Sequence, residues 1–171
     1  MTDALISDTA VVELRAQPTI AVRIQQPLAE LDLAAAFDRS LPRVAGRIGE
    51  LGVAVSGPPF GRYHRYGPDV VDVEIGFPVA TTPETLPALA GLAPGEVGAS
   101  ALPEGPAART ILRGPYSNLS AAYDALHAWI HDQPGIDDAA GPWESYLDDP
   151  RTVADAADIR TEIVWPVRRT A

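Results

Sequence analysis

Two stretches of the chain alternate between apolar and polar residues with the period of a half-buried strand. The first, "VVDVEIGFPV", places on one face Val71, Val73, Ile75, Phe77 and Val79. The second, "IRTEIVWPV", places on one face Ile159, Thr161, Ile163, Trp165 and Val167. The opposite faces carry Glu74 and Glu162 at matching positions, and each phrase contains a proline after its aromatic residue. The agreement predicts an internal repeat.

The segments upstream of these strands agree in the same order. "PFGRY" (59–63) precedes the first phrase and "PWESY" (142–146) the second. Further upstream, residues 32–52 and 119–135 show the apolar spacing of a helix that packs on a core. Short strands at 19–25 and 108–114 precede these helices. Each half therefore reads strand–helix–strand–strand.

The ends of the predicted helices carry recognisable signals. Gly52 is a C-terminal stop for the first helix, and Pro42 predicts a kink or a broken first turn within it. Ser117 is the expected N-cap of the second helix, and Pro134-Gly135 is its stop.

The predicted fold is α+β, with two pseudo-symmetric strand–helix–strand–strand modules packed side by side around a central ligand groove. A single domain covers 18–171, and residues 1–17 form an N-terminal extension. Module one spans about 18–80, a linker about 81–106, and module two about 107–168. The linker is rich in Pro, Gly and Thr and has room for one short strand.

Composition and charge narrow the range of possible functions. Hydrophobic residues make up 46% of the 171 residues, the formal net charge is −10, and cysteine is absent. The charge disfavours nucleic-acid binding, and the missing thiols exclude disulfides and cysteine chemistry. No long apolar run predicts a membrane span, and no signal sequence is evident at the N-terminus. We therefore expect a cytoplasmic protein.

The segment "GPWESYLDDP" carries the most informative candidate. Glu144 matches Gly61 in the repeat, so if the two positions face one groove, it holds a single central carboxylate. The alternative is a solvent-exposed glutamate on a strand. We expect Glu144 and Tyr146 on opposite faces of this strand, so that both line one cavity only if a β-bulge intervenes.

Other side chains could support such a site. Glu162 and Glu74 lie on the polar faces of their strands, where burial would raise their pKa values. Several aromatic residues are either core or cation–π walls, namely Tyr63, Tyr66, Tyr116, Trp143 and Trp165. His127 and His131 have helical i, i+4 spacing but show no third ligand, so we expect a solvated face, no metal and no cofactor.

Taken together, "GPPFGRYHRYGPDVVDVEIGFPV", "RGPYSNLSAAYDALHAWI", "GPWESYLDDP" and "RTEIVWPV" resemble the GyrI-like small-molecule-binding family. That family includes effector-binding domains of AraC-type and MerR-type multidrug regulators. The resemblance covers about Pro18 to Val167. It implies that Glu144 sits deep in an aromatic pocket with Trp143, Tyr146 and Trp165 as walls, and pairs with flat lipophilic cations.

Three functions follow. The first is binding of hydrophobic cationic or electrophilic aromatic molecules, by the set Glu144, Trp143, Tyr146, Tyr116, Tyr66, Trp165 and Glu162. The second, implied by hydrolases in the family, is opening of cyclopropane-bearing toxins by Tyr63, Glu144 and Glu162. The third is modulation of a protein partner, such as shielding of gyrase. Direct DNA binding is not expected without a helix-turn-helix segment, and the oligomeric state is left open.

Overall fold

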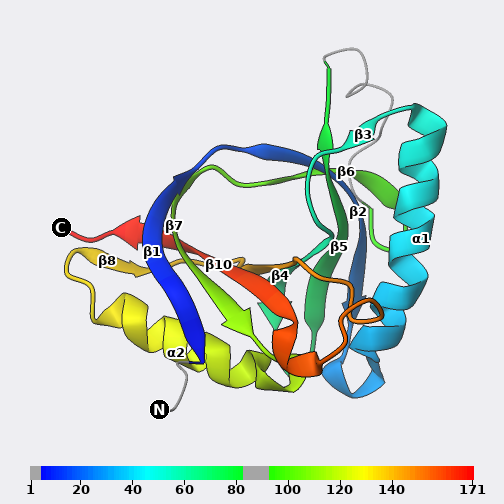
Figure 1. Ribbon diagram of the computed structural model, residues 1–171. Helices are drawn as coiled ribbons and strands as arrows, with labels where there is room; N and C mark the ends of the chain where they lie inside the picture. The colour runs from blue at the N-terminus through cyan, green and yellow to red at the C-terminus, as the bar shows by residue number, and fades with distance from the viewer. Residues whose placement is uncertain (1–4, 83–92) are drawn as a thin grey trace. The chain divides into compact units, whose positions relative to one another are not determined.

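The computed structural model describes residues 5–82 and 93–171, which form two α-helices and ten strands (Figure 1). In chain order these are β1 (Ile6–Leu14), β2 (Gln17–Gln26), α1 (Leu33–Leu51), β3 (Ala54–Val55), β4 (Phe60–Tyr66), β5 (Val71–Ala80), β6 (Val97–Leu102), β7 (Gly105–Arg113), α2 (Leu119–His131), β8 (Ile136–Asp138), β9 (Trp143–Tyr146) and β10 (Arg160–Arg169). Short 3-10 turns at Leu28–Glu30, Tyr116–Asn118 and Ala156–Asp158 connect them. The α+β class is confirmed.

The chain divides into two compact units. The N-terminal unit is Arg15–Glu104, and its strands pair in the order β6-β2-β5-β4, with β3 added to the end of β5. The C-terminal unit is Gly105–Ala171 together with β1, and its strands pair in the order β1-β7-β10-β9, with β8 added to the end of β10. All these pairs are antiparallel. Each unit therefore repeats one strand order, and the groove expected between the modules stays a prediction.

The strand register confirms the predicted repeat residue by residue. Ile75 on β5 pairs with Val22 on one side and with Gly61 on the other. Ile163 on β10 pairs with Thr110 and with Glu144 in the same way. Since Ile75 and Ile163 match in the sequence repeat, Gly61 and Glu144 occupy equivalent places in the two units.

Residues ahead of the first predicted strand form β1, which pairs along most of β7. The pattern of this segment does not predict a strand, because the exposed and half-buried residues of "ISDTAVVEL" do not alternate regularly. The register shifts between Ser7 and Ala10, and Asp8 takes a positive φ of 54°. In the linker, the short strand that the sequence allowed is β6; residues 83–92 of that linker lie outside the described residues.

The helices begin and end largely as their sequences predict. Asp32 caps α1 by accepting a hydrogen bond from the Ala35 amide at 3.0 Å, and Gly52 ends it with a φ of 66°. The helix continues through Pro42, so a broken first turn is wrong. The N-cap of α2 is Asn118 and not Ser117, because Ser117 lies within the 3-10 turn that precedes the helix.

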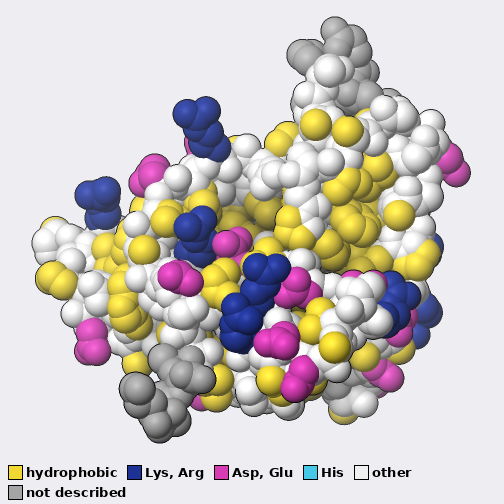
Figure 2. Space-filling model, in the orientation of Figure 1, with side chains coloured by type: hydrophobic (Ala, Val, Ile, Leu, Met, Phe, Trp, Pro, Cys, Tyr) yellow, Lys and Arg dark blue, Asp and Glu magenta, His cyan; other side chains and the backbone are white. Residues whose placement is uncertain are grey.

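Each helix packs on the apolar face of its own sheet. Ala36 of α1 lies in a cluster with Val71, Val73 and Ile75 of β5, and Val44 and Ile48 pack with Val79 and β2. In the C-terminal unit, α2 supplies Ala122, Leu126 and Ile130 to a core completed by residues of β7 and β10. Most charged side chains lie outside these cores, and on the face seen in Figure 2 basic side chains mostly lie beside acidic ones.

Close strand packing at Gly76 gives a test of the N-terminal sheet. A Cβ at Gly76 would overlap the Ile20 carbonyl oxygen and the Ala21 backbone. We expect Gly76→Ala to lower the free energy of unfolding by about 2 kcal/mol or more, the range of overpacked cores. Gly49→Ala on α1 is the control: a Cβ there meets nothing within 4 Å, so helix propensity should make it neutral or stabilising. Urea unfolding measures both, and equal stability of the two variants would contradict the register.

Candidate functional site

Glu144 is a buried carboxylate in the middle of β9, with 4% of its surface exposed. The Tyr146 hydroxyl donates a hydrogen bond of 2.6 Å to Glu144 Oε2. Burial raises the pKa of Glu144 because water no longer solvates the charged form, while hydrogen bonds from Tyr146 and Tyr123 act in the opposite direction. The result is a carboxyl group in a protein interior that accepts a hydrogen bond from the phenol of Tyr146.

The expectation that Glu144 and Tyr146 lie on opposite faces of the strand is wrong. Residues two apart along a regular strand share a face, and the hydrogen bond between them requires no bulge. That face is the one covered by α2, because Glu144 pairs with Ile163, and Ile163 packs with Leu126 and Ile130 of the helix. The carboxylate therefore lies between the sheet and α2.

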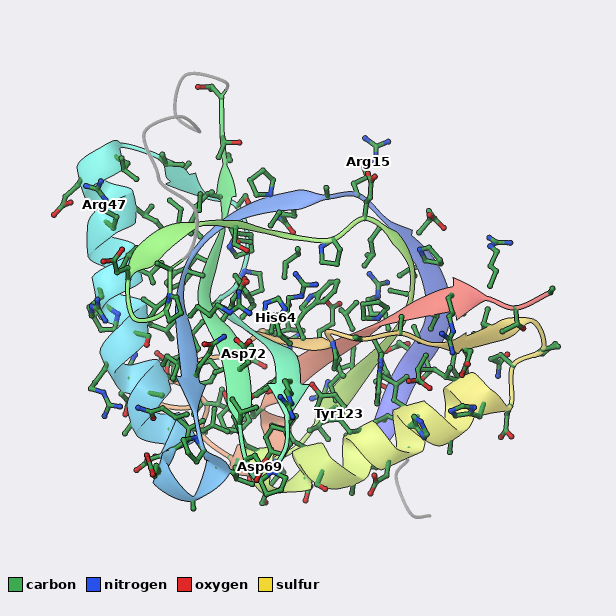
Figure 3. The ribbon with its side chains drawn as sticks, turned by 180° about the vertical axis from the view of Figure 1, so that it is seen from behind. Arg15, Arg47, His64, Asp69, Asp72 and Tyr123 are labelled. Carbon is green, nitrogen blue, oxygen red and sulfur yellow. The ribbon has the colours of Figure 1, made fainter. Side chains whose placement is uncertain are left out.

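Further polar groups surround Glu144 on this face. Tyr123 projects from α2 toward the strands (Figure 3). Thr161, which pairs with Tyr146, is fully buried, and its hydroxyl has no hydrogen-bond partner within the described part of the chain. Tyr116 meets the Tyr146 ring edge-on at 5.7 Å. Burial, followed by the charges of Asp149, Glu144 and Asp148, raises the pKa of Tyr116.

The N-terminal unit keeps a tyrosine, Tyr63, at the position equivalent to Tyr146, but it lacks the carboxyl and the threonine hydroxyl. Where the C-terminal unit has Glu144, it has Gly61, and where the C-terminal unit has Thr161, it has Val73. Val73 packs in a wholly hydrophobic cluster beside Leu41 and Tyr63. The fold does not need polar groups at these positions, since the other unit is built without them. We therefore call Glu144, Tyr146, Tyr123, Thr161 and Tyr116 the Glu144 cluster.

Two predicted site residues lie on the other face of the same sheet. Glu162 pairs with Ser145, and Trp143 pairs with Val164, so both alternate with the Glu144 face. Burial raises the pKa of Glu162, and Arg109, 3.7 Å from its carboxylate, acts against this rise. The structure does not bring Glu162 and Glu144 together.

The remaining predicted aromatics divide between the two units. Trp165 of the C-terminal unit packs edge-on against Tyr123 at 5.7 Å, and its indole donates to the Ala139 carbonyl at 2.9 Å. Tyr63 and Tyr66 belong to the N-terminal unit and contact each other edge-on at 5.9 Å. Tyr63 packs under α1, while Tyr66 is 62% exposed.

A second polar group occupies the non-helical face of the N-terminal sheet, and it includes Glu74, which the sequence placed on the polar face of its strand. Glu74 accepts from Ser100 at 2.9 Å and lies 2.8 Å from His64 Nε2. Arg23 donates two hydrogen bonds to Asp72, at 2.8 and 2.7 Å, which holds the pKa of that carboxyl below its usual value. These charges are already paired within the unit, so we assign them a structural role (His64 and Asp72 are labelled in Figure 3).

Similarity to known proteins identifies the family of this chain. Residues 8–168 match the family described as the GyrI-like small molecule binding domain. The chain belongs to this family. A comparison with curated proteins gave no match.

Solved structures share the fold of this GyrI-like domain. The EcmrR C-terminal domain is 25% identical with a TM-score of 0.76, covering 98% of this chain and all of that one. The EcmrR chain in the cryo-EM structure of the EcmrR–DNA complex in EcmrR-RPo is 25% identical to this chain. Its TM-score is 0.75, and the match covers 97% of this chain. The GyrI-like domain spans only 59% of the EcmrR chain in that complex. SAV2435 bound to tetraphenylphosphonium is 14% identical with a TM-score of 0.61, covering 95% and 94%.

These matches establish a small-molecule-binding domain of the GyrI-like family. Among the helices in the described ranges, neither is long and apolar enough to cross a membrane.

The buried carboxyl predicts a pH-dependent stability. Because the pKa of Glu144 is raised in the folded state, its contribution is fully present below the unfolded pKa near 4.5 and is lost as pH rises through the folded value. We expect Glu144→Gln, which cannot ionise, to stabilise the domain at pH 8 by about 1 kcal/mol. The gain should vanish toward pH 4. Urea unfolding across this pH range is the measurement.

The control is Glu96→Gln, at an exposed position of the N-terminal unit. It should leave the pH dependence of unfolding unchanged. A Glu144→Gln variant whose stability follows wild type at every pH would show that the carboxyl is fully solvated.

Proposed function

We propose that this GyrI-like domain binds lipophilic aromatic cations, with Glu144 as the charge that recognises them. The observation that carries the proposal is the burial of Glu144 beside phenols, with no basic side chain among the polar partners that the described residues 5–82 and 93–171 give it. SAV2435, which has the same fold, is bound to a ligand of this kind, tetraphenylphosphonium.

The energetics favour a cation over an anion or a neutral polar ligand. A buried carboxylate is costly unless a positive charge or hydrogen bonds compensate it. The Tyr146 hydroxyl supplies a hydrogen bond but no charge, so a cation beside Glu144 would be attracted more strongly than in water, because the effective dielectric is lower there. A lipophilic cation loses little hydration on burial, and the faces of Tyr123, Tyr146 and Tyr116 provide cation–π partners.

Hydrolysis of an electrophile is the second candidate function, and one observation favours it. A carboxyl with a raised pKa beside a phenol is a suitable general acid. However, Glu162 lies on the opposite face of the sheet from Glu144, so the pair of carboxylates that the mechanism would need is not assembled within the C-terminal unit. Binding is therefore the better supported function.

Binding of tetraphenylphosphonium tests the proposal. We expect wild type to bind it, and Glu144→Gln to lose about 2 kcal/mol, roughly thirtyfold in Kd, because the buried charge pair disappears. The neutral triphenylphosphine oxide should show a much smaller difference between the two proteins. Isothermal titration calorimetry measures both ligands.

Glu162→Gln is the matched control, since it removes a carboxylate from the other face of the same sheet. It should change the Kd by less than threefold. Equal loss in both variants would indicate a general charge effect and would contradict a specific role of Glu144. Consumption of an electrophilic ligand by wild type would instead favour the hydrolase.

Proton release on binding is an independent prediction. A cation beside Glu144 favours the ionised carboxylate, so binding should lower its raised pKa and release protons. Affinity should therefore rise with pH through the pKa of the free protein and level off above it. Titration in two buffers of different ionisation enthalpy measures the protons released, and Glu144→Gln should release none.

A further inference from the structure

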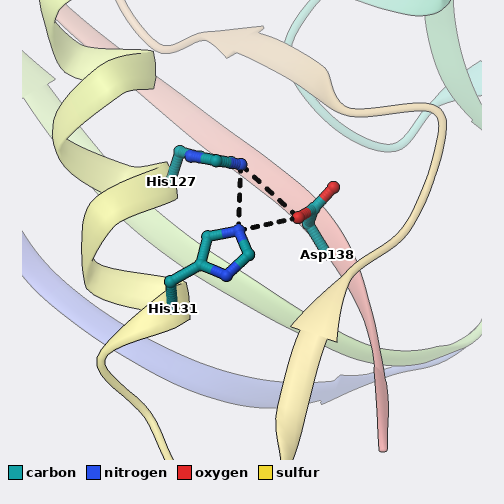
Figure 4. A group of neighbouring side chains, drawn as sticks. All are labelled: His127, His131 and Asp138. Atoms are coloured by element: carbon teal, nitrogen blue, oxygen red, sulfur yellow. Dashed lines mark hydrogen bonds and ion pairs between the residues drawn. The ribbon is translucent and has the colours of Figure 1, made fainter.

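Three potential metal ligands meet on the surface of the C-terminal unit (Figure 4). His127 and His131 project from successive turns of α2, and Asp138 lies on β8, the short strand beside the end of β10. The sequence showed the two histidines but not the third residue, since Asp138 becomes their neighbour only through the folding of β8 next to the helix.

The three ligand atoms have the spacing that one metal ion requires. His127 Nε2 lies 3.0 Å from His131 Nε2 and 3.5 Å from Asp138 Oδ1, and His131 Nε2 lies 3.1 Å from the same oxygen. Zinc binds such atoms at about 2.0–2.2 Å, and the edge of a tetrahedron with these bond lengths is about 3.3–3.6 Å. The triangle is thus close to one face of a tetrahedral coordination sphere.

The surroundings fit an open site. The side chains of both histidines are 48% exposed and that of Asp138 is 32% exposed, so solvent reaches the triangle. Asp137 Oδ1 lies 3.8 Å from His131 Nδ1, the ring nitrogen that faces away from the triangle. Arg168 donates a hydrogen bond of 2.6 Å to Asp137. The 3.8 Å separation is too long for a hydrogen bond, so Asp137 lies near the imidazole without fixing its orientation.

The fold itself does not require these residues. In α2, His127 and His131 directly follow the buried residues Leu126 and Ile130. At the matching places in α1, the buried Val44 and Ile48 are followed by Ala45 and Gly49. The equivalent of Asp138 is Val55, because these residues pair with the matching Val79 and Val167. The C-terminal unit thus carries three ligands where the N-terminal unit carries none.

We propose that His127, His131 and Asp138 bind a divalent transition-metal ion of the zinc class, with at least one coordination position open to water. Two imidazoles and one carboxylate favour such an ion over Mg²⁺ or Ca²⁺, which prefer oxygen ligands. The bound ion links α2 to β8 and so stabilises the C-terminal unit.

The test is calorimetric titration of ZnCl₂ into chelator-treated protein from which any affinity tag has been removed. We expect one zinc ion per chain in wild type. The double variant H127A/H131A should lose affinity by at least a hundredfold, and Asp138→Asn by at least tenfold. The chain has three histidines, so His64→Gln is a matched control that should bind as wild type does.

Thermal unfolding gives a second readout, since a ligand that binds only the folded state raises its unfolding temperature. Zinc should raise it in wild type and His64→Gln but not in H127A/H131A, and MgCl₂ should not raise it in any of them. Equal unfolding temperatures in EDTA would show that the double variant is folded. Wild type that does not saturate at millimolar zinc, or a double variant or Asp138→Asn that binds as tightly as wild type, would overturn the site.

Discussion

The long antiparallel pairing of β5 with β2, and of β10 with β7, fixes the position of nearly every other element. Each pair forms the centre of its unit, where side chains on one face pack under a helix. A shift of one residue in either pair would exchange the two faces and expose the core. The contact of Gly76 with the backbone of β2 leaves no room for such a shift in the N-terminal unit. The position of the Glu144 cluster is fixed by the same pairing, because its strand, β9, pairs directly with β10.

On this common frame the two units differ in chemistry. The N-terminal unit fills the space beneath its helix mostly with aliphatic and aromatic side chains, and the C-terminal unit places a carboxyl and a threonine hydroxyl in the corresponding space. The burial of Glu144 costs stability in the C-terminal unit, which fits the binding role that we propose for it, since functional sites commonly reduce the stability of the fold that holds them.

The repeat, both helices and the equivalence of Glu144 with Gly61 could be predicted because they depend on local periodicity that recurs in order. Strand β1 could not, since its irregular pattern gives no period and its partner β7 lies far along the chain. The sequence did not indicate Asp138 as a ligand, because a three-residue strand is too short to show a recognisable hydrophobic period. The shared face of Glu144 and Tyr146 was predictable from the sequence, since residues two apart in a regular strand lie on the same face. The opposite placement of Glu162 follows from the register of β9 against β10, which no single segment encodes.

The strand order has a consequence for how the chain is made. Strand β1 runs directly into β2 of the N-terminal unit but pairs with β7, and β6 runs directly into β7 but pairs with β2. During synthesis β1 leaves the ribosome before the other described strands, and it stays unpaired until β7 emerges about one hundred residues later. Such distant pairing slows folding and leaves an unpaired strand exposed in the meantime. If the chain were cut between β5 and β6, neither half would contain a complete sheet. The two halves therefore depend on each other's synthesis, although each has its own core.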